Sequence, residues 1–267
     1  MKKFSLLFVV VVVFVLLGYK FVADNFENNV VIIGHRGAMG YAPENTLESF
    51  KLAHEMEVDF LEFDVQMTKD GVLVAIHDTD VSRTTNGTGQ IKDLTLEELK
   101  QLDAGSKFNK KHAGARIPTV REIFEEFGDE TKYYIETKSP QSYPGIEEKL
   151  IALINEFNLL DKVILHSANI ESLSKLHKLA PDAELGLLLW YTETAYISDE
   201  EIDNVPEYIK YIIPNHEYLT KEYIEKVKKA GFLIHTYTVN EKEDFRRLVE
   251  MGVEGVITDY PDILIKE

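Results

Sequence analysis

The sequence of 267 residues predicts an α/β protein, a (β/α)8 TIM-type barrel, and three observations support the prediction. Apolar strand-like runs alternate with helical patterns, there are eight such runs, and helices separate most of them. A doubly wound open sheet is the alternative, but no glycine-rich dinucleotide fingerprint supports it. The runs are VVIIG (30–34), FLEFDV (60–65), YYIET (133–137), KVILHS (162–167), ELGLLLW (184–190), YIIPN (211–215), FLIHTYTV (232–239) and GVEGVIT (252–258). Helix-like stretches include TLESFKLAHEM (46–56), GIEEKLIALINEF (145–157) and TKEYIEKVKKA (220–230).

An N-terminal hydrophobic helix precedes the barrel pattern. Two lysines stand before an apolar stretch that runs from Phe4 to Ala23, interrupted by Lys20, which is just long enough to span a bilayer. Small residues suited to a cleavage site are missing, so an uncleaved anchor is favoured over a cleaved signal peptide. We therefore assign residues 1–24 to a signal-anchor or signal peptide and 25–267 to the barrel domain. Either assignment places the barrel outside the cytoplasmic membrane, as a single-pass membrane protein or a secreted one.

The first run ends in glycine and is followed directly by His35 and Arg36. Its β-branched residues are typical of a strand buried on both faces, and ligand sites gather where such strands end. Next, NTLESF (45–50) predicts a helix start, with Asn45 as the cap and Glu48 three residues on. A core histidine beside an ion-paired arginine is the alternative for this pair taken alone.

In the second run, Glu62 and Asp64 are two residues apart and therefore point to the same side of a strand. Two carboxylates facing a barrel interior need a partner, and a hard divalent cation such as Ca²⁺ or Mg²⁺ takes oxygen ligands. The alternative is a pair of solvated or salt-bridged acids on a strand edge.

A hairpin and an insertion interrupt the alternation after this run. Only TKDG (68–71) separates FDVQM from VLVAIH (72–77), which is too short for a parallel crossover and suits a hairpin. Residues 72–77 are therefore predicted as an antiparallel return strand with His77 at its end. Residues 78 to about 118 are rich in turn formers and predict a small insertion in the barrel.

The third run repeats the spacing of the second, because Glu136 and Lys138 also share a side. Glu136 could be a third metal ligand and Lys138 could bind an anionic oxygen, although a buried Glu–Lys pair is the alternative. Together with His35, His77 and the earlier acids, these residues converge at one predicted barrel mouth. A separate structural role for each of them is therefore less probable than one shared site. His166 and His216 also follow apolar runs, where a pocket role and a structural role are equally open.

Composition restricts the chemistry further. The absence of cysteine excludes disulfides, thiolate metal sites and cysteine nucleophiles. The formal net charge of −17 predicts repulsion of nucleic acid and of anionic lipid, so no nucleic-acid partner is expected, and membrane contact is expected through the N-terminal segment only.

Four motifs resemble the glycerophosphodiester phosphodiesterases, in order and with similar spacing. They are GHRG…APENT (34–46), LEFDVQMTKDGVLVAIHD (61–78), IETK (135–138) and GVITDYPD (255–262). The resemblance covers nearly the whole chain after the leader and implies a phosphodiesterase-type (β/α)8 barrel with a small insertion after the second histidine. Thr137 and Tyr237 depart from the commoner pattern, the latter standing where tryptophan is common.

The resemblance also implies roles for single residues. The acid–base pair would be His35 and His77. Ca²⁺ or Mg²⁺ would be held by Glu62, Asp64 and Glu136. The phosphate would be contacted by Arg36 and Lys138, and the alcohol pocket would be shaped by Tyr237.

The expected activity is metal-dependent hydrolysis of a small-molecule glycerophosphodiester to an alcohol and sn-glycerol 3-phosphate. A lysophospholipase D acting on single-chain lipids at the membrane is the nearest alternative, and a catalytically inactive envelope-binding domain is a second. The sequence leaves open the head group, the choice of metal, which histidine is the acid, direct water attack against a cyclic phosphate, and the oligomeric state.

Overall fold

Eight parallel strands close into a barrel, as the sequence predicts. The structure is a computed structural model that describes residues 30–189 and 202–264. Closure is shown by β1, which pairs in parallel with β2 through Ile33 and Phe60 and with β9 through Val31 and Gly255. The barrel strands are β1 (Val31–Gly34), β2 (Phe60–Met67), β4 (Tyr133–Thr137), β5 (Val163–Ser167), β6 (Glu184–Leu188), β7 (Ile209–Ile213), β8 (Leu233–Thr236) and β9 (Gly255–Thr258).

Each strand sends alternate side chains to the barrel interior and to the surrounding helices. On β2, Leu61, Phe63 and Val65 join the large apolar layer beneath the helices, where Phe63 packs edge-on against Phe50 with ring centroids 5.9 Å apart. The residues between them, Glu62 and Asp64, therefore face the interior, which confirms that the two carboxylates share a side.

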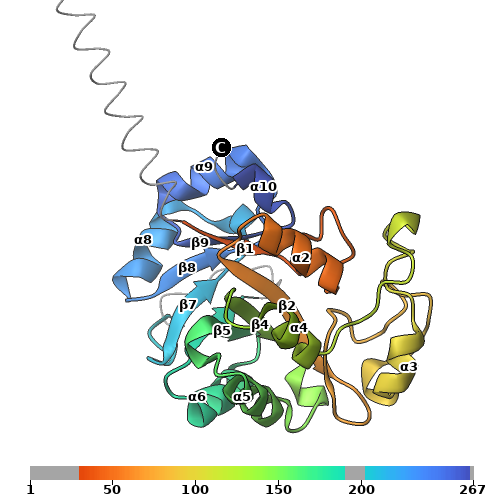
Figure 1. The fold of residues 1–267 in the computed structure, drawn as a ribbon. Coiled ribbons are helices and arrows are strands. Elements are labelled where there is room, and N and C mark those ends of the chain that lie inside the picture. Colours follow the sequence, from red (N-terminus) through yellow and green to blue (C-terminus); the bar gives the residue numbers. More distant parts are fainter. Residues whose placement is uncertain (1–29, 190–201, 265–267) are drawn as a thin grey trace, which may run out of the picture.

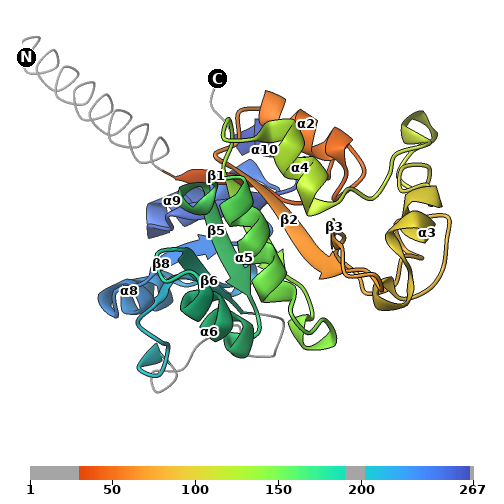
Figure 2. The same ribbon diagram turned by 60° about the horizontal axis from the view of Figure 1, so that its bottom comes forward.

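Helices surround the ring of strands (Figures 1 and 2). Apolar residues at helical spacing bury one face of each, and β-branched and aromatic strand residues fill the layer between helices and sheet. They are α2 (Leu47–Glu55), α4 (Val120–Phe127), α5 (Ile146–Glu156), α6 (Ile170–Leu179), α8 (Lys221–Lys229), α9 (Lys242–Met251) and the short α10 (Pro261–Leu264).

The cap of α2 differs from the prediction. Thr46, and not Asn45, is the N-cap, because the Thr46 hydroxyl accepts a hydrogen bond from the backbone N–H of Ser49 at 3.3 Å. Asn45 adopts a left-handed φ of 54° one residue earlier, and its amide donates to Asp64 Oδ2 at 2.8 Å. The residue predicted as a cap thus contacts the site at the barrel mouth instead.

The hairpin prediction is confirmed. Strand β3 (Leu73–Ala75) pairs antiparallel with β2, with Ala75 opposite Val65, and Gly71 supplies the positive φ of 81° that the turn requires. The insertion that follows contains α3 (Leu96–Gln101) and short 3-10 turns, and it shares a small apolar core, which includes Val81, with Val74 of β3. Figures 1 and 2 show it beside the barrel, on the side of β2.

The predicted N-terminal anchor, residues 1–24, lies outside the described residues. Within residues 30–189 and 202–264, no helix is long and apolar enough to cross a membrane.

Candidate active site

The predicted site residues meet at the carboxyl ends of the barrel strands. His35 directly follows β1, Lys138 directly follows β4, and the carboxylates of β2 and β4 lie side by side because Asp64 and Glu136 are register partners. One cavity of about 180 Å³ is lined by Tyr237 and by six of the seven polar residues of the predicted set. The seventh, Asp64, is buried and contacts Arg36 and Lys138. The predicted cavity-lining residues are His35, Arg36, Glu62, His77, Glu136, Lys138 and Tyr237.

His35 is held by a carboxylate from the far end of the chain. Its Nδ1 lies 2.6 Å from Asp259 Oδ1, and Asn240 donates to the other oxygen of Asp259 at 2.7 Å. Burial would raise the pKa of Asp259, but the hydrogen bond and charge of His35 outweigh it, so the pKa is lowered and the carboxylate stays ionised. Asp259 lies in the GVITDYPD motif, but its role could not be predicted from the sequence, because only the closed barrel brings it beside His35.

His77 has a similar arrangement. Its Nδ1 lies 2.7 Å from Asp78 Oδ1, and the Nε of Arg83, from the insertion, donates to Asp78 Oδ2. Burial lowers the pKa of His77, against the opposing charge of Asp64. Each of the two histidines therefore has Nδ1 bound to an aspartate.

Arg83 also connects the insertion to Arg36. Its guanidinium binds Glu44 with two hydrogen bonds of 2.6 and 2.7 Å, and Glu44 accepts a third bond of 2.7 Å from Arg36 Nη1. One continuous network of hydrogen bonds and ion pairs thus runs beside the cavity through Asp78, Arg83, Glu44 and Arg36. The contact between Arg83 and Glu44 could not be predicted from the sequence, because the two residues lie 39 positions apart and no local pattern joins them.

Arg36 contacts both carboxylates of β2. Its backbone N–H donates to Glu62 Oε2 at 2.7 Å, and its Nε lies 3.3 Å from Asp64 Oδ2. Lys138 lies 2.8 Å from Glu136 Oε1 and 3.6 Å from Asp64 Oδ1. Asp64 is consequently surrounded by two cations and an amide. Although burial would raise its pKa, Arg36 and Lys138 outweigh that effect and lower it.

The negative charges of Glu62 and Glu136 are less well compensated by nearby cations than that of Asp64. Burial, reinforced by the charge of Asp64, raises the pKa of Glu62 well above its usual range. Burial raises the pKa of Glu136 to about 7 despite the neighbouring Lys138. Three buried carboxylates share the site with two protein cations, Arg36 and Lys138, so a divalent cation would favour the ionised form of all three. Their oxygen donors fit Ca²⁺ or Mg²⁺.

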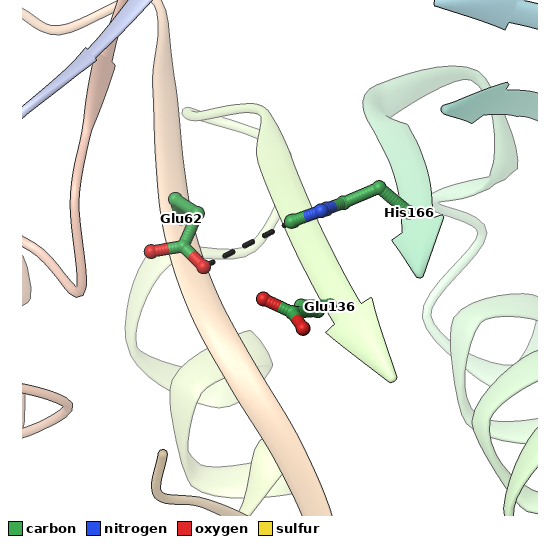
Figure 3. A group of neighbouring side chains, drawn as sticks. All are labelled: Glu62, Glu136 and His166. Atoms are coloured by element: carbon green, nitrogen blue, oxygen red, sulfur yellow. Dashed lines mark ion pairs between the residues drawn. The ribbon is translucent and has the colours of Figure 1, made fainter. Parts of the chain in front are cut away.

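His166 on β5 joins this group from a third strand (Figure 3). One ligand atom from each of Glu62, Glu136 and His166 can be chosen so that all three lie within 4.8 Å of one another. His166 also lines the cavity, which favours the pocket role over the purely structural one for this residue. His216 is absent from that lining and begins a short 3-10 turn after β7.

Tyr237 forms part of the cavity wall. It follows β8, and its hydroxyl donates to the backbone oxygen of Leu189 at 2.6 Å, which holds the ring in place. A second cavity of about 610 Å³ adjoins the first, since His77, Glu136 and Lys138 line both.

The fold and this cluster define the class of the protein: a (β/α)8-barrel enzyme whose site lies at the carboxyl edge of the strands. Comparison with known proteins identifies the family. Residues 35–263 match the glycerophosphoryl diester phosphodiesterase family. The chain belongs to this family and is a phosphoric diester hydrolase.

Individual relatives agree with this membership over most of their length. A glycerophosphodiester phosphodiesterase of Bacillus subtilis is 42% identical over 253 residues, which cover 90% of this chain and 86% of that protein. One of Caldanaerobacter subterraneus is 46% identical over 244 residues, which cover 88% and 96%.

Solved structures are similar as well. A glycerophosphodiester phosphodiesterase from Agrobacterium tumefaciens has a TM-score of 0.76 at 30% identity, with 88% of this chain and 98% of that one covered. A phosphodiesterase from Oleispira antarctica, solved in complex with the product sn-glycerol-3-phosphate, has a TM-score of 0.77 at 29% identity, with 91% and 97% covered.

Proposed function

We propose that this protein hydrolyses glycerophosphodiesters to an alcohol and sn-glycerol 3-phosphate, with a divalent cation and with His35 and His77 as the acid–base pair. The observation that carries the proposal is that both histidines line one cavity with Arg36 and Lys138, and that each has Nδ1 bound to an aspartate. The product named in the Oleispira antarctica complex supports glycerol 3-phosphate as the product here.

The two aspartates determine how the histidines act. With Nδ1 bound to Asp259 or Asp78, the Nε2 atom is the one that exchanges a proton with substrate. One ring accepts the proton of the attacking hydroxyl, and the other donates a proton to the departing alkoxide. Both steps require the rings to keep a fixed orientation, which the short contacts of 2.6 and 2.7 Å provide.

Charge on the phosphate is offset by Arg36 and Lys138. A phosphodiester monoanion gains negative charge on its equatorial oxygens as the transition state forms, and fixed cations stabilise that charge. Glu62, Asp64 and Glu136 would hold Ca²⁺ or Mg²⁺, which when bound supplies further positive charge at the same place. Arg36 is already oriented by Glu44 and Asp64, so it needs little rearrangement to bind the anion.

The proposal is tested by measuring release of the head-group alcohol from glycerophosphocholine, glycerophosphoethanolamine and a lysolipid, with and without chelator, together with glycerol 3-phosphate from the two water-soluble diesters. We expect release from the two water-soluble diesters, loss on chelation and recovery with Ca²⁺ or Mg²⁺. Release from the lysolipid alone would instead indicate a lysophospholipase D. Full activity in the presence of chelator would show that hydrolysis does not require a metal ion, contrary to the proposal.

We further propose that residues 1–24 anchor or export the barrel, which places it outside the cytoplasmic membrane. Deletion of these residues should release active enzyme into the soluble fraction, because the barrel begins only at Val31. An insoluble or inactive product would show that the leader is needed for the fold.

A further inference from the structure

His166 is a buried histidine of the barrel interior. The residue is 2% exposed, and within residues 30–189 and 202–264 neither Nδ1 nor Nε2 of its ring has a hydrogen-bond partner. A neutral imidazole carries one donor and one acceptor, and leaving both unsatisfied away from water is costly. Buried polar atoms of this kind call for an explanation, and a metal ion is one of the few that satisfies a ring nitrogen without a hydrogen bond.

The distances around the ring suit a shared ion better than a hydrogen bond. His166 Nε2 lies 3.9 Å from Glu62 Oε1, which is too long for a hydrogen bond. Two atoms that each bind one metal at roughly 2.1 Å lie up to about 4.2 Å apart. Figure 3 shows Glu62, Glu136 and His166 reaching toward a common point from β2, β4 and β5.

The ring is also held in position by its neighbours. The Tyr134 ring packs against it with centroids 4.6 Å apart, and Gly186 is its register partner on β6. A Cβ at Gly186 would come within 3.3 Å of the His166 Cβ, so the glycine leaves the space that the histidine side chain occupies. This packing fixes the imidazole beside the carboxylates without using its nitrogens.

We propose that His166 supplies a nitrogen ligand, through Nε2, to the divalent cation of this site, together with Glu62 and Glu136. The inference rests on the metal dependence proposed above and adds a ligand to the three carboxylates. The carboxylate oxygens of the site suit Ca²⁺, Mg²⁺ and Mn²⁺ alike. Mn²⁺ can also accept an imidazole nitrogen, which makes it a suitable probe of this ligand.

Electron paramagnetic resonance of Mn²⁺ bound to the full-length chain tests this without an activity assay. After chelation and dialysis, one equivalent of Mn²⁺ is added and electron spin-echo modulation is recorded. We expect modulation from a coordinated ¹⁴N nucleus in the wild-type protein. In His166→Gln the modulation should disappear, and the dissociation constant for Mn²⁺ should rise by about 10- to 100-fold.

Three other histidines provide matched controls. His235→Gln changes another buried histidine of the barrel interior, whose Nδ1 lies 3.1 Å from the Tyr134 hydroxyl, and it should keep the nitrogen modulation. The double variant His35→Ala/His77→Ala should keep it too, which excludes the two proposed acid–base histidines as the source even if His166→Gln fails to fold.

The outcomes separate this inference from the proposed function. Tight Mn²⁺ binding without nitrogen modulation in the wild-type protein would overturn the His166 ligand and leave the metal dependence standing. Modulation that survives in folded His166→Gln, or that is lost in His35→Ala/His77→Ala, would also overturn it. No Mn²⁺ binding at all would contradict both.

Discussion

His35 and Asp259 are 224 residues apart in the sequence, yet Nδ1 of one lies 2.6 Å from Oδ1 of the other. The contact exists because β9 pairs with β1 and closes the barrel, which places the residue after the last strand beside the residue after the first. The ends of the chain thus contribute the two partners of one proposed catalytic group.

Replacing Asp259 by Asn should lower kcat by about 10- to 100-fold, as part of the 10²- to 10⁴-fold that acid–base catalysis typically contributes. The amide keeps the shape of the side chain but loses the charge that orients and stabilises the His35 ring. Asp262→Asn is the control, because Asp262 accepts a hydrogen bond from Tyr41 at the exposed surface, and its replacement should leave kcat unchanged. Wild-type kcat in Asp259→Asn would show that this carboxylate does not assist His35.

Arg83 is absent from the lining of the 180 Å³ cavity. Replacing it by Gln should nevertheless lower kcat by about tenfold, because His77 and Arg36 would be held less well in position. The substitution frees Asp78 beside His77 and Glu44 beside Arg36. Arg121→Gln is matched to it, since Arg121 binds Glu156 with two hydrogen bonds of 2.7 Å on the outer surface. Equal rates in the two variants would show that the network plays no part in orienting the site.

The same network should make stability depend on pH at the acidic end. Burial opposes ionisation of Glu44, but Arg83 and Arg36 outweigh it, and the pKa of Glu44 is lowered; the pKa of Asp78 is lowered for the same kind of reason. A carboxyl whose folded pKa is depressed stabilises the fold above its unfolded pKa, and the contribution is lost as pH falls. The free energy of unfolding should therefore decrease from about pH 5 downward.

Chemical denaturation at several pH values, comparing wild type with Arg83→Gln, measures this contribution. The variant should show a shallower decrease than wild type, because its carboxyls titrate closer to their unfolded values. Parallel curves for the two proteins would contradict the assignment of the shifts to Arg83.

Replacing Glu62 by Gln should weaken metal binding before it weakens the chemical step. Glu62 faces His166 and Glu136, and loss of one carboxylate lowers the affinity for a divalent cation. Excess metal should thus restore part of the lost rate, whereas Glu156→Gln on the outer face of α5 should need no added metal. A Glu62→Gln rate that is independent of metal concentration would argue against this carboxylate as a ligand.

Much of the fold and site follows from local patterns. Alternation along β2 predicts that Glu62 and Asp64 point to the same side of that strand. The same spacing predicts that Glu136 and Lys138 point to one side of β4. The hairpin at Gly71 follows from the short connection between the two runs. The roles of Asp259, Glu44 and Arg83 could not be predicted in this way, because they depend on contacts between distant segments. Asn45 illustrates a local failure: both it and Thr46 can cap a helix, and the choice is made by Asp64, which binds the Asn45 amide.

The central claim is that His35 and His77 are the acid–base pair, and leaving-group dependence tests it most directly. An ordinary alkoxide needs a proton as it departs, whereas p-nitrophenolate hardly does, and a general acid or base typically contributes ~10²- to 10⁴-fold. His35→Ala and His77→Ala should each nearly abolish hydrolysis of glycerophosphocholine. With glycerophospho-p-nitrophenol, one variant should recover substantially, which identifies the acid, while the other stays slow. Rates near wild type on glycerophosphocholine in both variants would contradict the account, since the two histidines would then be structural.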